Sequence, residues 1–348
     1  MTVIRLARLR FPAGRSDRRQ SGPTVRALWA AVRVAASALF VQSFLFAAGA
    51  PAAAADKVVI GVPAWPSAAV TAHILADLLG SEFGLETELR DGSTLRILAD
   101  LNNGAAQIHP EVWFPNLQTA VDKYVKAGTV EVSPVDGAAS QNLCVTASTA
   151  TQTGIAAVTD LTDPAMAQNF DTDGDGKGEI WIGAPTWSST IIERIRAHSY
   201  GYDRTMTLLE APEDVAMASV DVAVSLDKPI VFYCYSPHHL FELHDIKVLG
   251  EPQHDPATWH IVLPADDANW LEDSKAGSAW DQSHFNIAFA SSLASDHPDV
   301  AAFLSRVRME PEDATMMSYA VDVDRKDPAE VATAWIVANA DRIRQWRQ

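Results

Sequence analysis

The sequence predicts an α/β protein of two lobes, each a sheet flanked by helices, joined by two hinge crossings. Short apolar strands alternate with amphipathic helices, and this order favours parallel pairing in an α/β sheet. The alternation starts near residue 57 and starts again near residue 142. The chain has 348 residues, of which 48% are hydrophobic and 20% are charged, and this length suits one or two globular domains.

The first 55 residues have the pattern of a secretory signal peptide. Several arginines precede an apolar run over residues 34–48, and the small residues PAAAA follow it. This order predicts cleavage near Ala54 or Ala55, and therefore export. An uncleaved membrane anchor is the alternative, although the apolar run is shorter than the ~20 residues that a span needs.

The chain is strongly acidic, with a formal net charge of −17. Removal of the arginine-rich first 55 residues makes the remainder more acidic still. Such a chain repels phosphate backbones, so we exclude nucleic acid as a partner. The charge by itself does not identify a ligand.

The first lobe is expected over residues 56–136 and 260–348. It begins with the strand Lys57–Val62, and apolar residues at helical spacing, such as Ile74 and Leu78, predict a helix after it. A strand over 85–89, a helix over 93–102 and a short strand follow. The next stretch, HPEVWFPN (residues 109–116), is predicted to be a loop, because its prolines suppress regular hydrogen bonding.

The second lobe is expected over residues 137–259. Its predicted strands cover 142–148, 179–185 and 229–235, and its predicted helices cover 189–199 and 213–226. The two crossings are placed near SPVDGAAS (133–140) and GEPQHDP (250–256). A strand-like piece, IVLP (261–264), and a run of helices to the C-terminus complete the chain.

Aromatic residues recur at the ends of these predicted strands. Trp65, Trp113 and Trp187 each follow a strand, and Tyr235 ends the strand over 229–235. Ligands of α/β sheets bind outside the carboxyl ends of the strands, so we expect these rings to converge on one cleft. Each ring face attracts a cation by about 0.5–2 kcal/mol, and quaternary ammonium groups are the ligands of such cages. The other tryptophans of residues 56–348 are expected to pack in the core.

The run TWSSTIIERIRA (residues 186–197) predicts a site for an anion. Ser188 stands at a helix start, and Glu193 fits a capping box with Thr190. Free backbone N–H groups at a helix start attract a carboxylate, and His238 or His239 could donate a further hydrogen bond. Glycine betaine is the smallest ligand that has both a quaternary nitrogen and a carboxylate.

With these motifs the chain resembles the glycine betaine/proline betaine substrate-binding proteins of ABC transporters. The motifs are HPEVWFPN, GAPTW, YCYSPHHLF and AWIVANADRIRQW, and the resemblance covers essentially all of the mature chain. It implies a two-lobed, type II-like periplasmic binding protein that closes over a methylated amine. It also implies delivery of the ligand to a permease in the inner membrane, and we expect the binding protein to be a monomer.

The resemblance also implies roles for individual residues. It assigns the aromatic box to Trp65, Trp113, Trp187 and Tyr235, the last at a position where relatives commonly have tryptophan. His238 matches the histidine that binds the ligand carboxylate. Glu111 either orients the box or accepts a hydrogen bond from a ligand hydroxyl. Similar proteins take choline, carnitine or trimethylamine N-oxide, so the preferred amine stays open.

Cys144 and Cys234 both lie in predicted strands. An exported chain meets an oxidising compartment, and a single pair of cysteines there tends to form a disulfide. We therefore predict a bridge between them, with two buried free thiols as the alternative.

The segment DTDGDGKGE (residues 171–179) matches the opening of a calcium-binding loop. The candidate ligands are Asp171, Asp173, Asp175, Lys177 through its backbone oxygen, and Glu179. Position twelve is Ile182 rather than the usual bidentate glutamate. The loop is therefore either a structural calcium site or a solvated turn, and no other cofactor is expected.

A metal-dependent periplasmic hydrolase is the alternative from a different class. His238, His239, Glu242 and His244 are residue types that bind metals. They lack the histidine pair of the HExxH motif, and Ser236 lacks a nucleophile elbow. We therefore expect a binding protein rather than an enzyme.

Overall fold

The computed structural model describes residues 57–348, so the predicted signal peptide lies outside the described residues. The strands are β1 (Val58–Val62), β2 (Thr87–Asp91), β3 (Ile108–Phe114), β4 (Val130–Val132), β5 (Gly137–Thr146), β6 (Gly178–Trp181), β7 (Met206–Leu209), β8 (Val231–Ser236), β9 (Ile246–Val248), β10 (Trp259–His260), β11 (Lys275–Ala276) and β12 (Ser283–Ala290). The α-helices are α1 (Pro66–Phe83), α2 (Thr94–Asn103), α3 (Gln118–Lys126), α4 (Ala147–Thr153), α5 (Pro164–Ala167), α6 (Ser188–Tyr200), α7 (Glu213–Ser225), α8 (Leu240–Leu243), α9 (Trp270–Asp273), α10 (Ser291–Asp296), α11 (Pro298–Leu304), α12 (Pro311–Asp322), α13 (Pro328–Ala338) and α14 (Ala340–Trp346).

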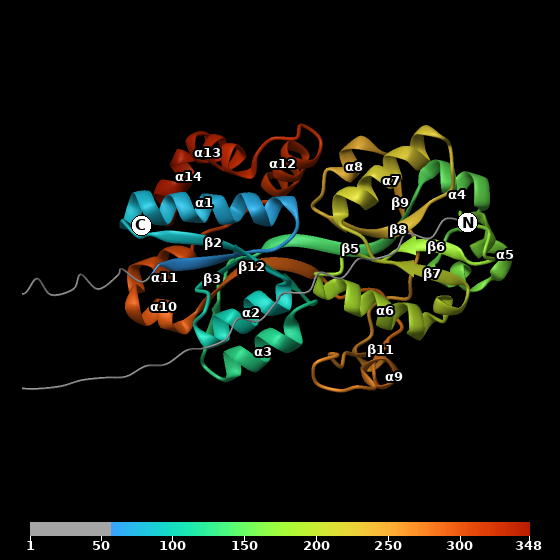
Figure 1. The fold of residues 1–348 in the computed structure, drawn as a ribbon, viewed down its shortest axis with the longest axis horizontal. Helices are drawn as coiled ribbons and strands as arrows, with labels where there is room; N and C mark the ends of the chain where they lie inside the picture. The colour runs from blue at the N-terminus through green and yellow to red at the C-terminus, as the bar shows by residue number, and fades with distance from the viewer. Residues whose placement is uncertain (1–56) are drawn as a thin grey trace, which may run out of the picture. The chain divides into compact units, whose positions relative to one another are not determined.

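Most strands join one mixed sheet in the order β2-β1-β3-β12-β5-β8-β6-β7, with β4 paired to β12 and β9 paired to β5. At one end, β1 runs parallel to β2 and β3, and at the other end β6 runs parallel to β7 and β8. Helices cover both faces at each end, for example α1 and α13 opposite α2 and α3, and α7 opposite α6 (Figure 1). The chain therefore has the predicted α/β architecture with two helix-covered parts.

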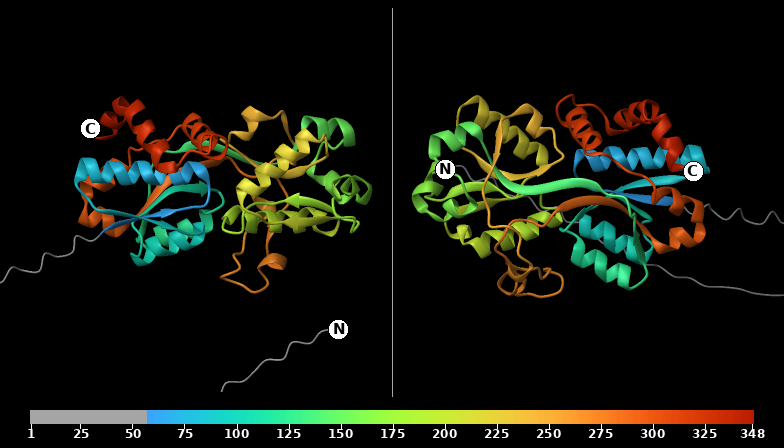
Figure 2. Two further views of the ribbon diagram at one scale, coloured as in Figure 1. Left: turned by 45° about the horizontal axis from the view of Figure 1, so that its top comes forward. Right: turned by 180° about the vertical axis from the view of Figure 1, so that it is seen from behind.

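Two long strands connect the two parts of the sheet. β5 and β12 pair antiparallel where Gly137–Ala139 lie against Ser283–Phe285. β12 then pairs with β3, while β5 continues to pair with β8. The two strands run side by side through the middle of the fold, as the rear view in Figure 2 shows. These paired strands are the physical connection between the two lobes.

The prediction of a loop at HPEVWFPN was wrong, because six of its residues belong to the buried strand β3. Proline has no N–H to give to a sheet ladder. The pairing of β3 with β12 contains a bulge. Three steps along β3, from His109 to Val112, lie opposite only two steps along β12, from Ala288 to Asn286. Pro110 lies within this extra length of β3, and bulges are places where a sheet tolerates proline.

The strand expected at IVLP was also wrong. The observed strand β10 ends at His260, and the central strand β12 lies in a region where only helices were expected. Residues between β9 and β12 instead pack on α6, where the Ala276 N–H donates to Ser199 Oγ at 2.9 Å. The expected lobe boundaries at residues 136 and 259 remain a prediction.

The two ends of α1 have residues that suit the start and the end of a helix. α1 has Pro66 in its first turn and ends before Gly84, which adopts a φ of 68°. Proline suits the first turn of a helix, and the left-handed backbone after its last turn suits glycine.

None of the helices within residues 57–348 is both long and apolar enough to cross a membrane.

Candidate ligand-binding site

A pocket with about 360 Å³ of empty space lies where the two parts of the fold meet. Its wall consists of Trp65, Thr94, Trp113, Asn116, Leu117, Trp187, Ser188, Ser189, Tyr233 and Tyr235. A mostly apolar wall with few polar groups is typical of small-molecule sites. The residues from Trp65 to Leu117 belong to the segment expected to form the first lobe, and the rest belong to the segment expected to form the second.

Four elements position the aromatic side chains of the wall. Trp65 immediately precedes α1, and Trp187 immediately precedes α6. Trp113 and Tyr235 are each the next-to-last residue of a strand, β3 and β8 respectively. The sequence pattern of aromatic residues at strand ends therefore identified positions that the fold does bring together.

The rings meet edge to face. The ring centroids of Trp65 and Trp187 are 6.2 Å apart, those of Trp113 and Tyr235 are 5.3 Å apart, and those of Trp187 and Tyr235 are 5.8 Å apart. Their interplanar angles lie between 82° and 90°. Such packing presents ring faces from several directions, which is the arrangement that binds a methylated ammonium group.

Glu111 lies behind this wall and does not line the pocket. Its carboxylate accepts hydrogen bonds from the Trp113 Nε1–H and from the Ser67 hydroxyl, both at 3.0 Å. Burial raises the pKa of Glu111 to about 7, although these donors act in the opposite direction. Glu111 therefore contacts the ring of Trp113, and this contact fits the predicted role of Glu111 in orienting the aromatic box.

The polar part of the wall joins the two lobes directly. The backbone N–H of Ser188 donates to Thr94 Oγ1 at 3.1 Å, and the N–H of Thr94 donates to the Thr186 carbonyl at 3.3 Å. The indole N–H of Trp187 donates to the Ala64 carbonyl at 3.3 Å. These hydrogen bonds hold α6 against α2 and against the turn that precedes α1, so the structure has the lobes in contact around the pocket.

The capping box expected between Thr190 and Glu193 is absent from α6. The helix begins at Ser188, with Trp187 at the capping position, so Thr190 already lies inside the first turn. The Thr190 hydroxyl donates to the Ala184 carbonyl at 2.6 Å, and Glu193 accepts from the Trp280 Nε1–H at 2.8 Å. Tertiary packing rather than local capping therefore determines where Glu193 points.

His238 lies behind Tyr235 rather than in the pocket wall. Its Nδ1 accepts the Leu240 N–H at 3.1 Å, and its Nε2 is 3.2 Å from Glu213 Oε1. Burial lowers the pKa of His238 to about 4, so the ring is neutral near pH 7. In this structure Nε2 faces the Glu213 carboxyl group, and binding of a ligand carboxylate by His238 remains a prediction.

Sequence reasoning missed several residues of the site. Thr94, Asn116 and Leu117 line the pocket, and Glu213 accepts a 2.5 Å hydrogen bond from the Tyr235 hydroxyl. The position of Asn116 at the end of HPEVWFPN was a signal for it. Glu213 gave no signal, because its contact with Tyr235 crosses from α7 to β8.

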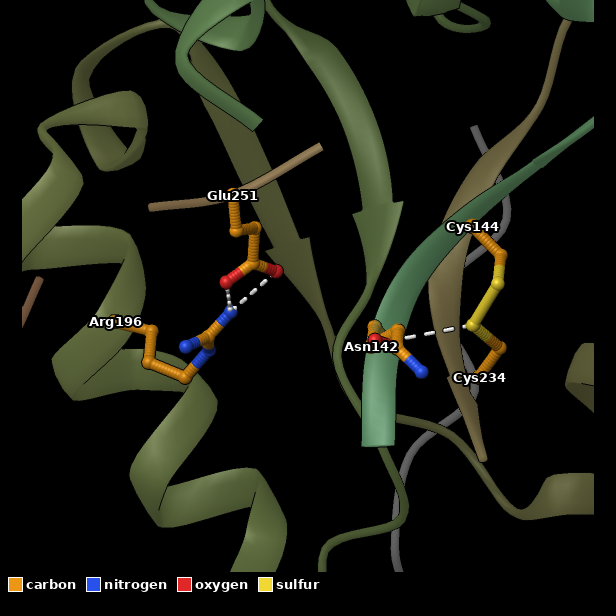
Figure 3. Close-up of a disulfide and its surroundings, with 5 residues drawn as sticks. All are labelled: Asn142, Cys144, Arg196, Cys234 and Glu251. Carbon is orange, nitrogen blue, oxygen red and sulfur yellow. Dashed lines mark hydrogen bonds and ion pairs between the residues drawn. A yellow bond between two sulfur atoms is a disulfide. The ribbon is translucent and has the colours of Figure 1, made fainter. Parts of the chain in front are cut away.

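The structure joins Cys144 of β5 to Cys234 of β8 in a disulfide, with 5.8 Å between their Cα atoms (Figure 3). The two strands are antiparallel neighbours, in which Cys144 pairs with Phe232 and Cys234 pairs with Asn142. Nearby, Arg196 of α6 binds the Glu251 carboxylate at 2.6 and 2.7 Å (Figure 3). Neither the two cysteines nor Arg196 and Glu251 line the pocket, although Cys234 lies between Tyr233 and Tyr235, which do.

The acidic segment before β6 forms a tight turn. Asp171, Asp173, Asp175 and Glu179 each offer a carboxylate oxygen within 4.8 Å of the others. Asp171 also accepts from the Gly176 N–H, and the Lys177 N–H donates to Asp175 Oδ1 at 2.8 Å. The carboxylates are thus gathered as a calcium site requires, and calcium binding remains a prediction.

The residues of the hydrolase alternative have separate partners. His244 Nε2 lies 2.7 Å from Asp221, whereas His239 Nδ1 lies 3.2 Å from the Ser318 hydroxyl. His239 and His244 flank opposite ends of α8, so their positions do not suggest that they bind one metal ion together. His238 and His239 do lie close together and offer nitrogens within 4.8 Å of an Asp322 oxygen, whereas His244 has Asp221 as its partner and does not join this group.

Comparison with known proteins places the chain in a family. Residues 56–338 match the family described as the substrate binding domain of ABC-type glycine betaine transport system. The glycine betaine/proline betaine-binding periplasmic protein of Salmonella typhimurium is 28% identical over 104 residues, which are 30% of this chain and 31% of that relative. The alignment therefore spans about a third of that relative's length.

Two longer similarities cover most of the chain. The trimethylamine N-oxide-binding protein of Pelagibacter ubique is 24% identical over 318 residues, covering 87% of this chain and 95% of that protein. A solved ABC-transporter choline binding protein in complex with choline has a TM-score of 0.66 at 18% identity, covering 83% of this chain and 91% of that one. This chain therefore has the two-lobed fold and belongs to the family of substrate-binding domains of ABC-type glycine betaine transport systems, which is a family of transport proteins rather than of enzymes.

Proposed function

We propose that this protein is the periplasmic substrate-binding protein of an ABC importer and that it holds a methylated amine in the aromatic pocket. The observation that carries the proposal is the edge-to-face box of Trp65, Trp113, Trp187 and Tyr235. Each of these residues is no more than 8% exposed. A buried cage of ring faces binds a methylated ammonium better than carboxylates alone would, because this cation has no N–H to donate.

Glycine betaine is the first candidate ligand. Its quaternary nitrogen suits the rings, and its carboxylate suits the start of α6, where Ser188 and Ser189 reach the pocket. Choline, carnitine and trimethylamine N-oxide are the alternatives, and the names of the relatives support choline and trimethylamine N-oxide as well as glycine betaine. All four ligands have a methylated nitrogen that the same rings would surround.

The remaining parts of the proposal concern the setting of this site. We infer export to the periplasm from the pattern of the first 55 residues and from periplasmic relatives. The partner would be a permease in the inner membrane, and the binding protein would work as a monomer. Opening and closing of the lobes about β5 and β12 would admit and release the ligand.

Isothermal titration of the purified protein with glycine betaine, choline, carnitine and trimethylamine N-oxide tests this function. We expect micromolar binding of at least one amine, and we expect Trp113→Ala to abolish it. Trp270→Ala is the matched control, since Trp270 belongs to α9 and does not line the pocket. Failure of all four amines to bind would contradict the cage.

A further inference from the structure

Two buried carboxyl groups stand directly behind two walls of the aromatic pocket. Glu111 accepts the indole N–H of Trp113, and Glu213 accepts the hydroxyl of Tyr235. Glu111 is 2% exposed and Glu213 is 5% exposed. Each carboxyl group is therefore separated from the pocket by the single ring that it binds.

The pocket wall offers these carboxyl groups no positively charged side chain from the described part of the chain. The residues that line the pocket in residues 57–348 include no lysine and no arginine. His238 lies beside Glu213 and is neutral near pH 7 because burial lowers its pKa. Asp214 on α7 and Asp322 on α12 also influence this region, and both are acidic.

The buried carboxyl group of Glu213 has fewer hydrogen bonds than its two oxygens could accept. Its Oε2 is buried and has no hydrogen-bond partner within the described part of the chain. A carboxyl group with an unpartnered buried oxygen gains little from being ionised while the pocket is without a positive charge. A cation on the other side of Tyr235 would supply the missing attraction.

We propose that Glu213, together with Glu111, is the counter-charge of the pocket, and that these two groups make it select ligands with a permanent positive charge. This inference rests on the proposed function, because it concerns the same pocket. The ring faces attract the methyl groups of the ligand, and the two carboxylates attract its charge at longer range. Glu213 is a positioning residue for Tyr235 as well as a source of charge.

The raised pKa values of Glu213 and Glu111 make the proposal testable, because they predict how ligand affinity changes with pH. Burial raises the pKa of Glu213 to about 8 and that of Glu111 to about 7. A bound cation favours the ionised carboxylates, so binding of the ligand releases protons below these values. The affinity for a cationic amine should therefore rise as the pH increases from about 6 to about 8.5.

The experiment compares an amine with its tert-butyl analogue, in which carbon replaces the quaternary nitrogen. The amine is the tightest binder among glycine betaine and choline, and titrations cover about pH 6 to pH 8.5. The variants are Glu213→Gln, which removes the charge, and Tyr235→Phe, which keeps the ring and removes the hydroxyl. Asp214→Asn is the matched control, because it makes the same change of charge at the exposed neighbour of Glu213.

We expect Glu213→Gln to weaken binding of the amine by about tenfold, as loss of a nearby unit charge should. Binding of the neutral-centre analogue should stay unchanged, and the dependence on pH should flatten. Tyr235→Phe should keep the preference for the amine over its analogue. Asp214→Asn should keep that preference as well, although loss of a neighbouring negative charge lowers the pKa of Glu213 and so moves the pH dependence to lower pH.

Equal loss of amine and analogue in Glu213→Gln would overturn the proposal, since Glu213 would then only support the ring. Unchanged affinity of that variant for the amine would overturn it as well. A wild-type protein that binds amine and analogue equally would leave the cage in place and refute the role of the charge. Absence of binding to any amine would instead refute the proposed function itself.

Discussion

The indole N–H of Trp113 donates to the carboxylate of Glu111, with 3.0 Å between Nε1 and Oε1, although the two residues are only two positions apart on β3. Ser67 of α1 donates to the same carboxylate. The side chain of Glu111 thus ties a wall of the pocket to the first turn of α1.

Replacement of Glu111 by alanine should loosen this wall. The change leaves the Trp113 N–H and the Ser67 hydroxyl without their shared acceptor, which costs about 1–3 kcal/mol of unfolding free energy. We also expect about tenfold weaker binding of the amine, because the ring loses its fixed orientation. Chemical unfolding and titration calorimetry measure both effects.

Glu88→Ala is the control for this change. Glu88 lies on β2, its side chain is 43% exposed and it pairs with the exposed Arg90. An exposed pair contributes about 1 kcal/mol at most, so this variant should keep its affinity and nearly all of its stability. An unaltered affinity of Glu111→Ala would show that Trp113 needs no such support.

The stability of the ligand-free protein should depend on pH through its buried carboxyl groups. Burial raises the pKa of Glu213 to about 8, and it raises the pKa of Glu111 and of Asp322 to about 7. These groups hold protons more tightly in the folded state than in the unfolded state. Their contribution is thus fully present below about pH 4.5 and is lost as the pH rises through about 7 to 8.

Urea unfolding at about pH 5.5 and about pH 8 checks this dependence. The buried carboxyl groups lower the free energy of unfolding at the higher pH, whereas His109, His238 and His239, whose pKa values burial lowers, act in the opposite direction. Glu213→Gln should shift the difference between the two pH values toward greater stability at the higher pH, because glutamine does not titrate. An identical difference in the variant would show that Glu213 does not hold its proton in the folded protein.

Arg196 should be essential for the stability of the second lobe. Its guanidinium is fully buried, contacts Glu193 at 2.9 Å and Glu251 at 2.6 Å, and donates to the Ser278 carbonyl. Burial acts to lower the pKa of Arg196, but the two carboxylates outweigh it and raise the pKa above its ordinary value. Arg196→Met would leave two buried carboxylates unpaired and should cost about 3–5 kcal/mol.

Arg194→Met provides the comparison for Arg196→Met in equilibrium unfolding. Arg194 lies on the same helix, but its side chain is 43% exposed and pairs with Glu210. Its loss should cost about 1 kcal/mol or less. Similar losses for the two variants would mean that the buried pairs contribute no more than the exposed one.

Calcium should stabilise the turn that contains Asp171, Asp173 and Asp175. A ligand at a hundredfold excess over its dissociation constant adds about 2.7 kcal/mol to the free energy of unfolding. We expect added Ca²⁺ to raise the melting temperature of chelator-treated protein, and Asp173→Ala to remove that rise. A melting temperature that Ca²⁺ leaves unchanged would identify the segment as a solvated acidic turn.

Much of the fold could be predicted from local sequence. The helices α1, α2, α6 and α7 lie within one or two residues of the expected ranges where these were given, because helical spacing of apolar residues is a local signal. The central strand β12 could not be predicted in this way. Most of its residues are buried, so SHFNIAFA gave no clear alternation of apolar and polar side chains.

The sequence by itself determined the class of the fold and the aromatic positions at the strand ends, since both follow from the order of residues along short segments. Only the tertiary structure decided what stands behind those rings. Glu213 meets Tyr235 across 22 positions of the chain, and Glu193 turns from its own helix start to Trp280 across 87. Burial raises the cost of an unpaired polar group, so partners distant in sequence help to determine where Glu213 and Glu193 lie.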